Sequence, residues 1–258
     1  MKLAGKIAAI TGGTAGLGRG IAEAFLAEGA SVALMARNPE KGERVLTELG
    51  AGMRAIFVPG DALVQHDIES FVDRTVANFG TIDILVNNAG GAGDLQPMVN
   101  LSDEAFDLAM KWNVYATFWA SRRALKTMIE RQHGRIINIS SMEGKHGKAI
   151  FSAYTAAKHA INGMTKSLAR EVGTQGITVN AICPGLVITD IIMNNGPATA
   201  KAMGLEFQEM IDLFAQESAI KRPNTVEEVA AVALLLASPE GAGITGAMIS
   251  VDGGTAQY

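Results

Sequence analysis

Residues 7–28 read IAAITGGTAGLGRGIAEAFLAE, which is a short apolar run, a glycine-rich turn and a segment with helical spacing. The run at 7–11 is apolar throughout, as is typical of a parallel strand that is covered on both faces. Gly12, Gly16 and Gly18 permit a tight turn and a close backbone approach, and the helix that follows directs free N–H groups at an anion. The segment therefore predicts a strand–turn–helix unit that binds a pyrophosphate group.

The same alternation of apolar runs and helical patterns continues to the end of the chain. Strands are expected at 7–11, 31–36, 54–59, 82–87, 135–140, 178–183 and 247–251. Helices are expected at 16–28, 39–50, 65–79, 102–131, 152–174, 200–216 and 225–237. Such alternation favours an open parallel sheet with helices on both faces. We therefore predict an α/β fold, a doubly wound, Rossmann-type three-layer sandwich around a central parallel seven-stranded sheet.

Length and composition exclude several other classes of protein. The 258 residues suffice for one sizeable core, so we predict a single dinucleotide-binding catalytic domain over 1–258. The 22 Lys and Arg do not exceed the 26 Asp and Glu, which argues against a nucleic-acid partner. One Cys and four scattered His predict no disulfide scaffold and no metal site. No uninterrupted apolar run is long enough to span a membrane, and we predict a cytoplasmic protein.

The residues that end the second expected strand bear on the choice of cofactor. A dinucleotide fold usually has an acid there, which holds the ribose 2′-hydroxyl of NAD. Here Ala36 occupies that position and Arg37 follows it. A planar, permanently charged guanidinium suits a 2′-phosphate. We therefore favour NADP(H), and NAD(H) stays possible because the choice depends on these two residues alone.

A tyrosine and a lysine share one face of the helix expected at 152–174. Tyr154 and Lys158 lie at i and i+4, and an ammonium so placed favours the phenolate and is expected to lower the tyrosine pKa. Ser140 and Ser141 end the strand that precedes this helix, where a hydroxyl can hydrogen-bond a carbonyl oxygen. Together these side chains predict acid–base chemistry on a carbonyl or an alcohol.

Over essentially its whole length the chain resembles the short-chain dehydrogenases/reductases in their standard-length form. The residues that carry the resemblance are Gly12, Gly16, Gly18, Asn87, Asn88, Ala89, Gly90, Asn113, Ser141, Tyr154, Lys158, Pro184, Gly185, Val251, Asp252, Gly253 and Gly254. The family pattern selects Ser141 over Ser140, because Met142-Glu143-Gly144 follows it.

The resemblance implies a role for each of four catalytic residues. Tyr154 would act as the acid or base, and Lys158 would lower its pKa and hold the nicotinamide ribose. Ser141 would polarise the carbonyl, and Asn113 would bend the central helix and keep a water in a proton relay. Hydride transfer itself would belong to the cofactor.

The resemblance also implies cofactor contacts along the whole groove. These are expected at Gly12, Thr14, Gly16, Leu17, Gly18, Arg37, Asp61, Ala62, Asn88, Ala89, Gly90, Tyr154, Lys158, Pro184, Gly185, Val187 and Thr189. Asp61 and Ala62 would lie near the adenine, and Val187 and Thr189 near the carboxamide.

The expected activity is reversible hydride transfer between NADP(H) and a ketone or secondary alcohol. Apolar residues within 188–216 predict a substrate lid, with a plain surface loop as the alternative, and favour apolar cyclic, steroid-like or 3-oxoacyl substrates. Two other functions stay open: an NAD-dependent 3-hydroxy-acid dehydrogenase, and a catalytically silent dinucleotide-binding sensor. The resemblance further suggests a homotetramer, with the helices at 102–131 and 152–174 in one interface.

Overall fold

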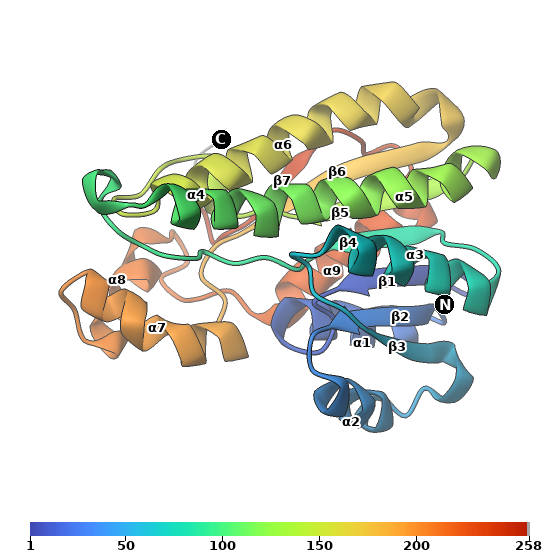
Figure 1. Ribbon diagram of the computed structural model, residues 1–258, viewed down its shortest axis with the longest axis horizontal. Helices are drawn as coiled ribbons and strands as arrows, with labels where there is room; N and C mark the ends of the chain where they lie inside the picture. Colours follow the sequence, from blue (N-terminus) through green and yellow to red (C-terminus); the bar gives the residue numbers. More distant parts are fainter. Residues whose placement is uncertain (257–258) are drawn as a thin grey trace.

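The computed structural model describes residues 1–256, apart from the side chain of Ile191, which falls within the expected lid. Seven parallel strands form one sheet in the order β3-β2-β1-β4-β5-β6-β7, with helices on both faces (Figure 1). The strands are β1 Ile7–Thr11, β2 Ser31–Ala36, β3 Ala55–Pro59, β4 Ile84–Asn87, β5 Gly134–Ile139, β6 Ile177–Pro184 and β7 Met248–Val251. The predicted doubly wound α/β fold is therefore confirmed.

The helices form the two outer layers of the sandwich. They are α1 Gly16–Ala27, α2 Pro39–Leu49, α3 Gln65–Phe79, α4 Asp103–Met110, α5 Ala116–Glu130, α6 Ser152–Val172, α7 Asp190–Ala202, α8 Phe207–Glu217 and α9 Val226–Ala237. Helices α1, α2 and α9 pack on one face of the sheet, and α3, α5 and α6 pack on the other.

Strands β1 to β6 each contribute to two separate cores. Because successive side chains of a strand point to opposite faces, Ala8 and Ile10 of β1 join the core beneath α1 and α9. Ala9, between them, joins the core beneath α3 and α5. This double burial explains why the strands of this sequence are continuous apolar runs rather than alternating ones.

The strand order reverses direction at β1. The chain builds β2 and β3 on one side of β1 and then crosses over to place β4 on the other side. In such sheets the carboxyl ends of the two strands at the reversal open a crevice between the loops that follow them. The glycine turn follows β1 and Asn88 follows β4, so both lie at this crevice.

The segment 102–131 is not the continuous helix that its spacing predicts, and it is interrupted around Asn113, the residue to which the family resemblance assigned a bend. It contains α4, a π-helical turn at Lys111–Tyr115, and α5. Asn113 lies in the turn, where its side-chain amide donates to Ala109 O at 2.9 Å, and its backbone carbonyl accepts from Thr117 Oγ1 at 2.8 Å. These side-chain bonds compete with the regular backbone ladder, which is a recognised cause of such bulges.

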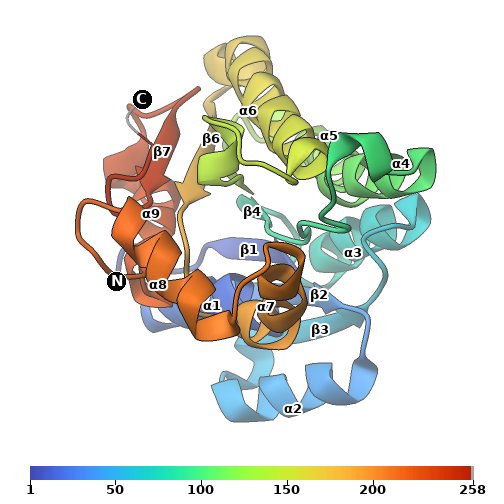
Figure 2. The same ribbon diagram turned by 90° about the vertical axis from the view of Figure 1, so that its left-hand side faces the viewer.

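The segment after β6 also differs from the expectation, because 188–199 is largely helical and 200–216 is not one helix. The Thr189 hydroxyl accepts from Ile192 N at 3.5 Å and starts α7. Gly204, with φ of +73°, turns the chain from α7 into α8. A Cβ on Gly196 would lie 2.2 Å from the Phe207 ring, so this glycine lets the two helices pack closely. Figure 2 shows α7 and α8 together beyond the carboxyl edge of the sheet.

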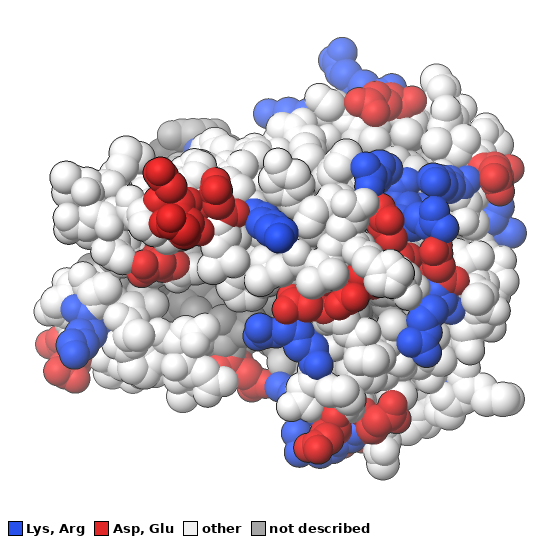
Figure 3. Space-filling view, in the orientation of Figure 1, with Lys and Arg blue, Asp and Glu red and all other residues white. Residues whose placement is uncertain are grey.

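The surface carries no single dominant charge on the face shown in Figure 3. Basic and acidic side chains are interspersed there, with acidic residues gathered at α4. Within residues 1–256, no helix is both long and apolar enough to cross a membrane. The same residues contain no group of three His, Cys, Asp or Glu placed to hold a metal ion.

Candidate active site

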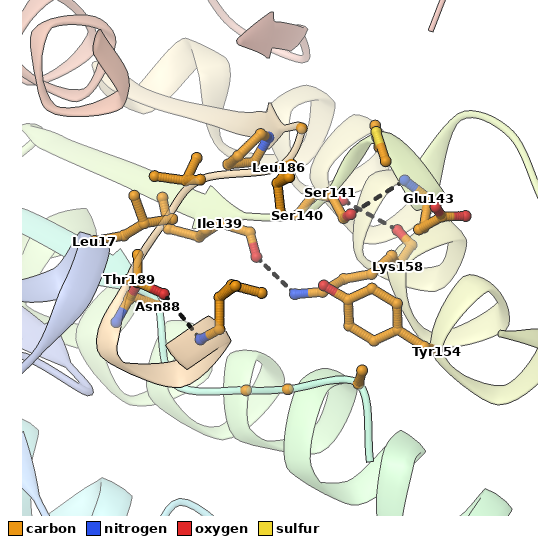
Figure 4. Close-up of a pocket in the computed structure, with 18 of the residues that line it drawn as sticks. Leu17, Asn88, Ile139, Ser140, Ser141, Glu143, Tyr154, Lys158, Leu186 and Thr189 are labelled. Carbon is orange, nitrogen blue, oxygen red and sulfur yellow. Dashed lines mark hydrogen bonds between the residues drawn. The ribbon is translucent and has the colours of Figure 1, made fainter. Parts of the chain in front are cut away.

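A cavity of about 300 Å³ opens at the carboxyl edge of the sheet (Figure 4). Its walls come from the turn after β1, the segment after β4, the end of β5, the start of α6 and the segment after β6. A second cavity of about 260 Å³ shares Gly12, Ala89 and Gly90 with the first and extends to Arg37 after β2. The two cavities therefore follow one another across the crevice where the strand order reverses.

The glycine turn has the geometry that a dinucleotide pyrophosphate requires. Gly12 has φ of +65°, a conformation that favours glycine. A Cβ on Gly18 would lie 2.4 Å from Gly12 O, so α1 packs directly against the turn. The first turn of α1 contains no acidic residue, and Ala15 provides no side-chain cap, which leaves N–H groups of the helix N-terminus available to an anion. The residues present thus fit the cofactor that the sequence predicts.

Asn88 fixes the turn from the opposite side. Its amide nitrogen donates to Thr11 O at 2.9 Å and to Gly12 O at 3.1 Å. The backbone N–H groups of Asn88 and Ala89 both donate to Thr11 Oγ1 at 3.0 Å. The side chain of Asn88 therefore holds the two edges of the crevice together, in addition to lining the cavity.

Ser141, Tyr154 and Lys158 lie on one wall of the first cavity (Figure 4). Lys158 Nζ donates to Ile139 O at 2.9 Å and lies 5.4 Å from the centroid of the Tyr154 ring. Ser141 Oγ accepts from Glu143 N at 3.1 Å, which leaves its own proton free to donate. One face of α6 and the end of β5 thus bring together the three groups that the sequence singled out.

In the ligand-free protein the pKa of Tyr154 is raised overall, whereas the position of Lys158 on the same helix face predicted a lower one. Burial raises the pKa of Tyr154 to about 12, and hydrogen bonding with Ser141 opposes this rise only in part. Burial also lowers the pKa of Lys158 to about 8. The reason is that removing either side chain from water disfavours its charged form. At neutral pH Tyr154 therefore carries its proton and can donate it.

The pKa of Lys158 is directly measurable, and we expect a titration midpoint near pH 8 in the ligand-free protein. The pKa of Lys158 is about 8 in the folded state and 10.5 in an unfolded chain, so this group makes the fold more stable as pH rises from 8 toward 10.5. The ¹³Cε chemical shift of labelled lysine reports the midpoint, with Lys158→Met assigning the signal. A midpoint close to 10.5 would show that the ammonium is fully hydrated.

Asn113 is buried and lines neither cavity. Its amide donates to Gly91 O at 3.0 Å, and its side-chain oxygen accepts from Gly91 N at 3.3 Å. A Cβ on Gly90 would lie 2.5 Å from that oxygen. Asn113 thus supports the floor of the cavity through the backbone of Gly90 and Gly91.

Most residues expected to contact the cofactor do line the crevice. Those in the first cavity are Gly12, Leu17, Asn88, Ala89, Gly90, Tyr154, Lys158, Pro184, Gly185, Val187 and Thr189. Arg37, Asp61 and Ala62 line the second cavity with the three shared residues. Thr14, in the glycine turn, and Gly16 and Gly18, in the first turn of α1, line neither cavity.

Arg37 is exposed at the mouth of the second cavity. Its guanidinium makes no ion pair or hydrogen bond with any residue that the structure describes. Ala36, beside it, has no carboxylate that could hold the ribose 2′-hydroxyl of NAD. The arrangement leaves a cation free to pair with a phosphate.

Several lining residues come from distant parts of the chain and were not predicted, among them Leu108 and Trp112 in the second cavity and Phe151 in the first. Ile192 and Phe214, which also line the first cavity, are among the apolar residues of 188–216 that predicted the lid. Trp112 adjoins the predicted Asn113, which was the only available signal. Leu108 and Phe151 reach the cavities through packing that no local spacing reveals.

The short chain dehydrogenase family matches this chain over residues 6–200. The chain belongs to that family. This short-chain dehydrogenase/reductase is 37% identical to D-beta-hydroxybutyrate dehydrogenase of Rhizobium meliloti, over 98% of the chain and 99% of that protein. It is 35% identical to the 3-oxoacyl-acyl-carrier-protein reductase of Escherichia coli, over 98% of both.

Solved structures agree with this assignment. The actinorhodin polyketide ketoreductase with NADPH superposes with a TM-score of 0.93 at 34% identity, over 98% of both chains. Levodione reductase superposes with a TM-score of 0.90 at 30% identity, over 99% of both. The predicted family and enzyme class are thereby confirmed: the protein is an NAD(P)-dependent oxidoreductase that acts on CH–OH groups.

Proposed function

We propose that this enzyme interconverts a ketone and a secondary alcohol with NADP(H), on apolar cyclic, steroid-like or 3-oxoacyl substrates. The observation that carries the proposal is the shared wall of Ser141, Tyr154 and Lys158 beside the glycine turn. The full catalytic set with Asn113 is present, which favours an enzyme over a silent dinucleotide-binding sensor.

In the reductive direction, Tyr154 gives its phenolic proton to the substrate oxygen. Its raised pKa keeps that proton in place at neutral pH. Ser141 donates a second hydrogen bond to the same oxygen, where negative charge develops. A bound nicotinamide supplies or accepts the hydride.

Lys158 and Asn113 support this chemistry from behind the reacting atoms. An ammonium has three donors, and Lys158 uses one of them on Ile139 O, so two stay available to ribose hydroxyls. Asn113 holds the backbone of Gly90 and Gly91 against the cofactor groove. The water relay that the family resemblance implies for Asn113 stays a prediction.

The preference for NADP(H) rests on Arg37, whose unpaired guanidinium lines the second cavity. The 2′-phosphate distinguishes NADP from NAD, and a guanidinium can bind it with two hydrogen bonds. We assign Arg37 to this contact.

The lid helices favour an apolar substrate. Ile192 of α7 and Phe214 of α8 both line the first cavity, and we propose that 188–216 forms the substrate lid. The alternative, an NAD-dependent 3-hydroxy-acid dehydrogenase, is supported by the name of the Rhizobium meliloti relative. A carboxylate substrate would meet only one cationic side chain in the described wall, because Lys158 is the sole Lys or Arg there.

We also propose that one domain carries the whole site, because lining residues extend from Gly12 to Phe214. A cytoplasmic homotetramer is the assembly that we favour. Exposed Tyr115, Phe118 and Ile129 provide apolar surface on the segment that the family resemblance assigns to one interface.

Oxidation of reduced cofactor by the purified protein tests the proposal. We expect absorbance at the reduced-nicotinamide band to fall with NADPH and either a cyclic ketone or an acetoacetyl thioester, and to fall far more slowly with NADH. Turnover with NADH and acetoacetate alone would favour the hydroxy-acid alternative. Silence with both cofactors across a wide panel of ketones would contradict the enzyme assignment at this site.

A further inference from the structure

Glu143 is an acidic residue in the wall of a cavity that is otherwise largely apolar. It is 3% exposed and lies two residues after Ser141, in the short helical turn Met142–Gly144. The turn is held at both ends: Glu143 N donates to Ser141 Oγ at 3.1 Å, and Asn162 Nδ2 donates to Gly144 O at 2.7 Å. The position of Glu143 beside the reacting serine is thus built into the fold.

The carboxylate of Glu143 is incompletely paired. Its Oε1 lies 3.5 Å from His146 Nε2, and its buried Oε2 has no hydrogen-bond partner among the residues that the structure describes. A buried acceptor without a donor is costly, and it is rare outside functional sites. The mechanism proposed above uses neither oxygen.

The charged groups nearest to Glu143 do not supply the missing donor. Lys148 Nζ donates to both carboxylate oxygens of Glu217 in α8, at 2.8 and 3.1 Å. The same nitrogen lies 3.5 Å from the centroid of the Phe214 ring. The imidazole of His146 faces only Oε1. Because Glu143 lines the first cavity, a bound substrate is a source of the missing donor.

We propose that the substrate carries a hydroxyl group besides the reacting carbonyl, and that Glu143 accepts its hydrogen bond. This inference rests on the proposed function and narrows its substrate class to hydroxylated ketones, or the diols formed from them. A hydroxyl suits a mostly apolar wall better than a charged group, because removing an ammonium or a carboxylate from water costs far more free energy. Burial raises the pKa of Glu143, which disfavours its charged form and therefore an ionic partner.

Matched ketones test the proposal. The 3- and 4-hydroxycyclohexanones are compared with the corresponding methylcyclohexanones, which have nearly the same size but no donor. With the wild-type enzyme and NADPH, we expect kcat/KM for the better hydroxy isomer to exceed that of its methyl counterpart by about 10-fold, within the range expected for leaving a buried acceptor unsatisfied. Equal values for both pairs would overturn the proposal and leave the proposed function intact.

Variants assign the preference to Glu143. Glu143→Leu should bring the hydroxy-to-methyl ratio close to one, and Glu143→Gln should retain part of it, because an amide oxygen still accepts. Met142→Leu, a volume-conserving change in the same turn, is the matched control and should keep the wild-type ratio. A ratio that survives in Glu143→Leu, or a higher kcat/KM for aminocyclohexanones than for the hydroxy isomers, would refute the hydroxyl assignment.

A binding measurement separates failure of this inference from failure of the proposed function. Saturation-transfer NMR reports whether the wild-type protein with bound cofactor prefers the hydroxy ketone, even if no ketone is turned over. Preferential binding without turnover would support the Glu143 contact and contradict the reductase assignment. Equal binding of the hydroxy and methyl ketones would refute the contact with Glu143, whether or not the enzyme turns them over. If Glu143→Leu does not fold, Glu143→Gln replaces it in this comparison.

Discussion

Tyr154→Phe is expected to lower kcat/KM by about 1,000-fold or more, because it removes the proton donor and alters no other atom of the side chain. The phenolic group lies in the wall of the first cavity, and its raised pKa keeps it protonated at neutral pH. Affinity for the reduced cofactor should stay within a small factor of the wild-type value. Steady-state kinetics and a fluorescence titration of the reduced nicotinamide measure the two quantities.

A second tyrosine provides the control for this change. Tyr115 is 51% exposed in the π-helical turn, and its ring lies against Trp119 with centroids 5.6 Å apart. Tyr115→Phe should therefore leave turnover near the wild-type value. If Tyr154→Phe retained most of its activity, another group would have to donate the proton.

Arg37→Ala is expected to weaken binding of NADPH by about 10- to 100-fold, which is the value of a charge-assisted hydrogen-bond pair. Binding of NADH should change little, because NADH has a hydroxyl where NADPH has the phosphate. The exposed position of Arg37 beside the second cavity makes loss of stability an implausible cause of the effect. Titration of each reduced cofactor against the wild-type and variant proteins gives both dissociation constants.

Arg44 is the matched control for Arg37. Arg44 also lies on the surface, in α2, and its ion pair with Glu48 is loose, at 3.9 Å. Arg44→Ala should leave both dissociation constants nearly unchanged. Equal losses for NADPH and NADH in Arg37→Ala would mean that Arg37 contacts a part common to both cofactors.

Local patterns were sufficient for elements whose burial is uniform along the chain. The predicted bounds of the first two strands, 7–11 and 31–36, match β1 and β2 to the residue. Both strands are covered by helices on two faces, so their apolar runs stop where the cover stops. The i and i+4 spacing of Tyr154 and Lys158 likewise predicted a shared face, because helix geometry alone imposes it.

Predictions were wrong where side chains act on the backbone or on one another over distance. Helical spacing predicted one continuous helix over 102–131, and only the family resemblance assigned a bend to Asn113. The break between α4 and α5 depends on hydrogen bonds from Asn113 that a helical hydrophobic pattern does not contain. The helix α7 was missed because Asn194-Asn195-Gly196-Pro197 favours a turn, whereas packing against α8 favours a helix. The direction of the Tyr154 pKa shift also escaped prediction, because burial depends on the assembled wall.

The sequence by itself therefore determined the family, the sheet and the identity of the acid–base residues, since strand–helix alternation and helix spacing are local properties. Only the tertiary structure decided which side chains meet at the cavity. It placed the unpaired oxygen of Glu143 in the same wall as Tyr154. It also brought Phe214 of α8 into that wall, although Phe214 follows Glu143 by about 70 residues. These contacts between distant residues form because the packed layers bring the carboxyl ends of separate strands to one edge of the sheet. No local sequence pattern determines that arrangement.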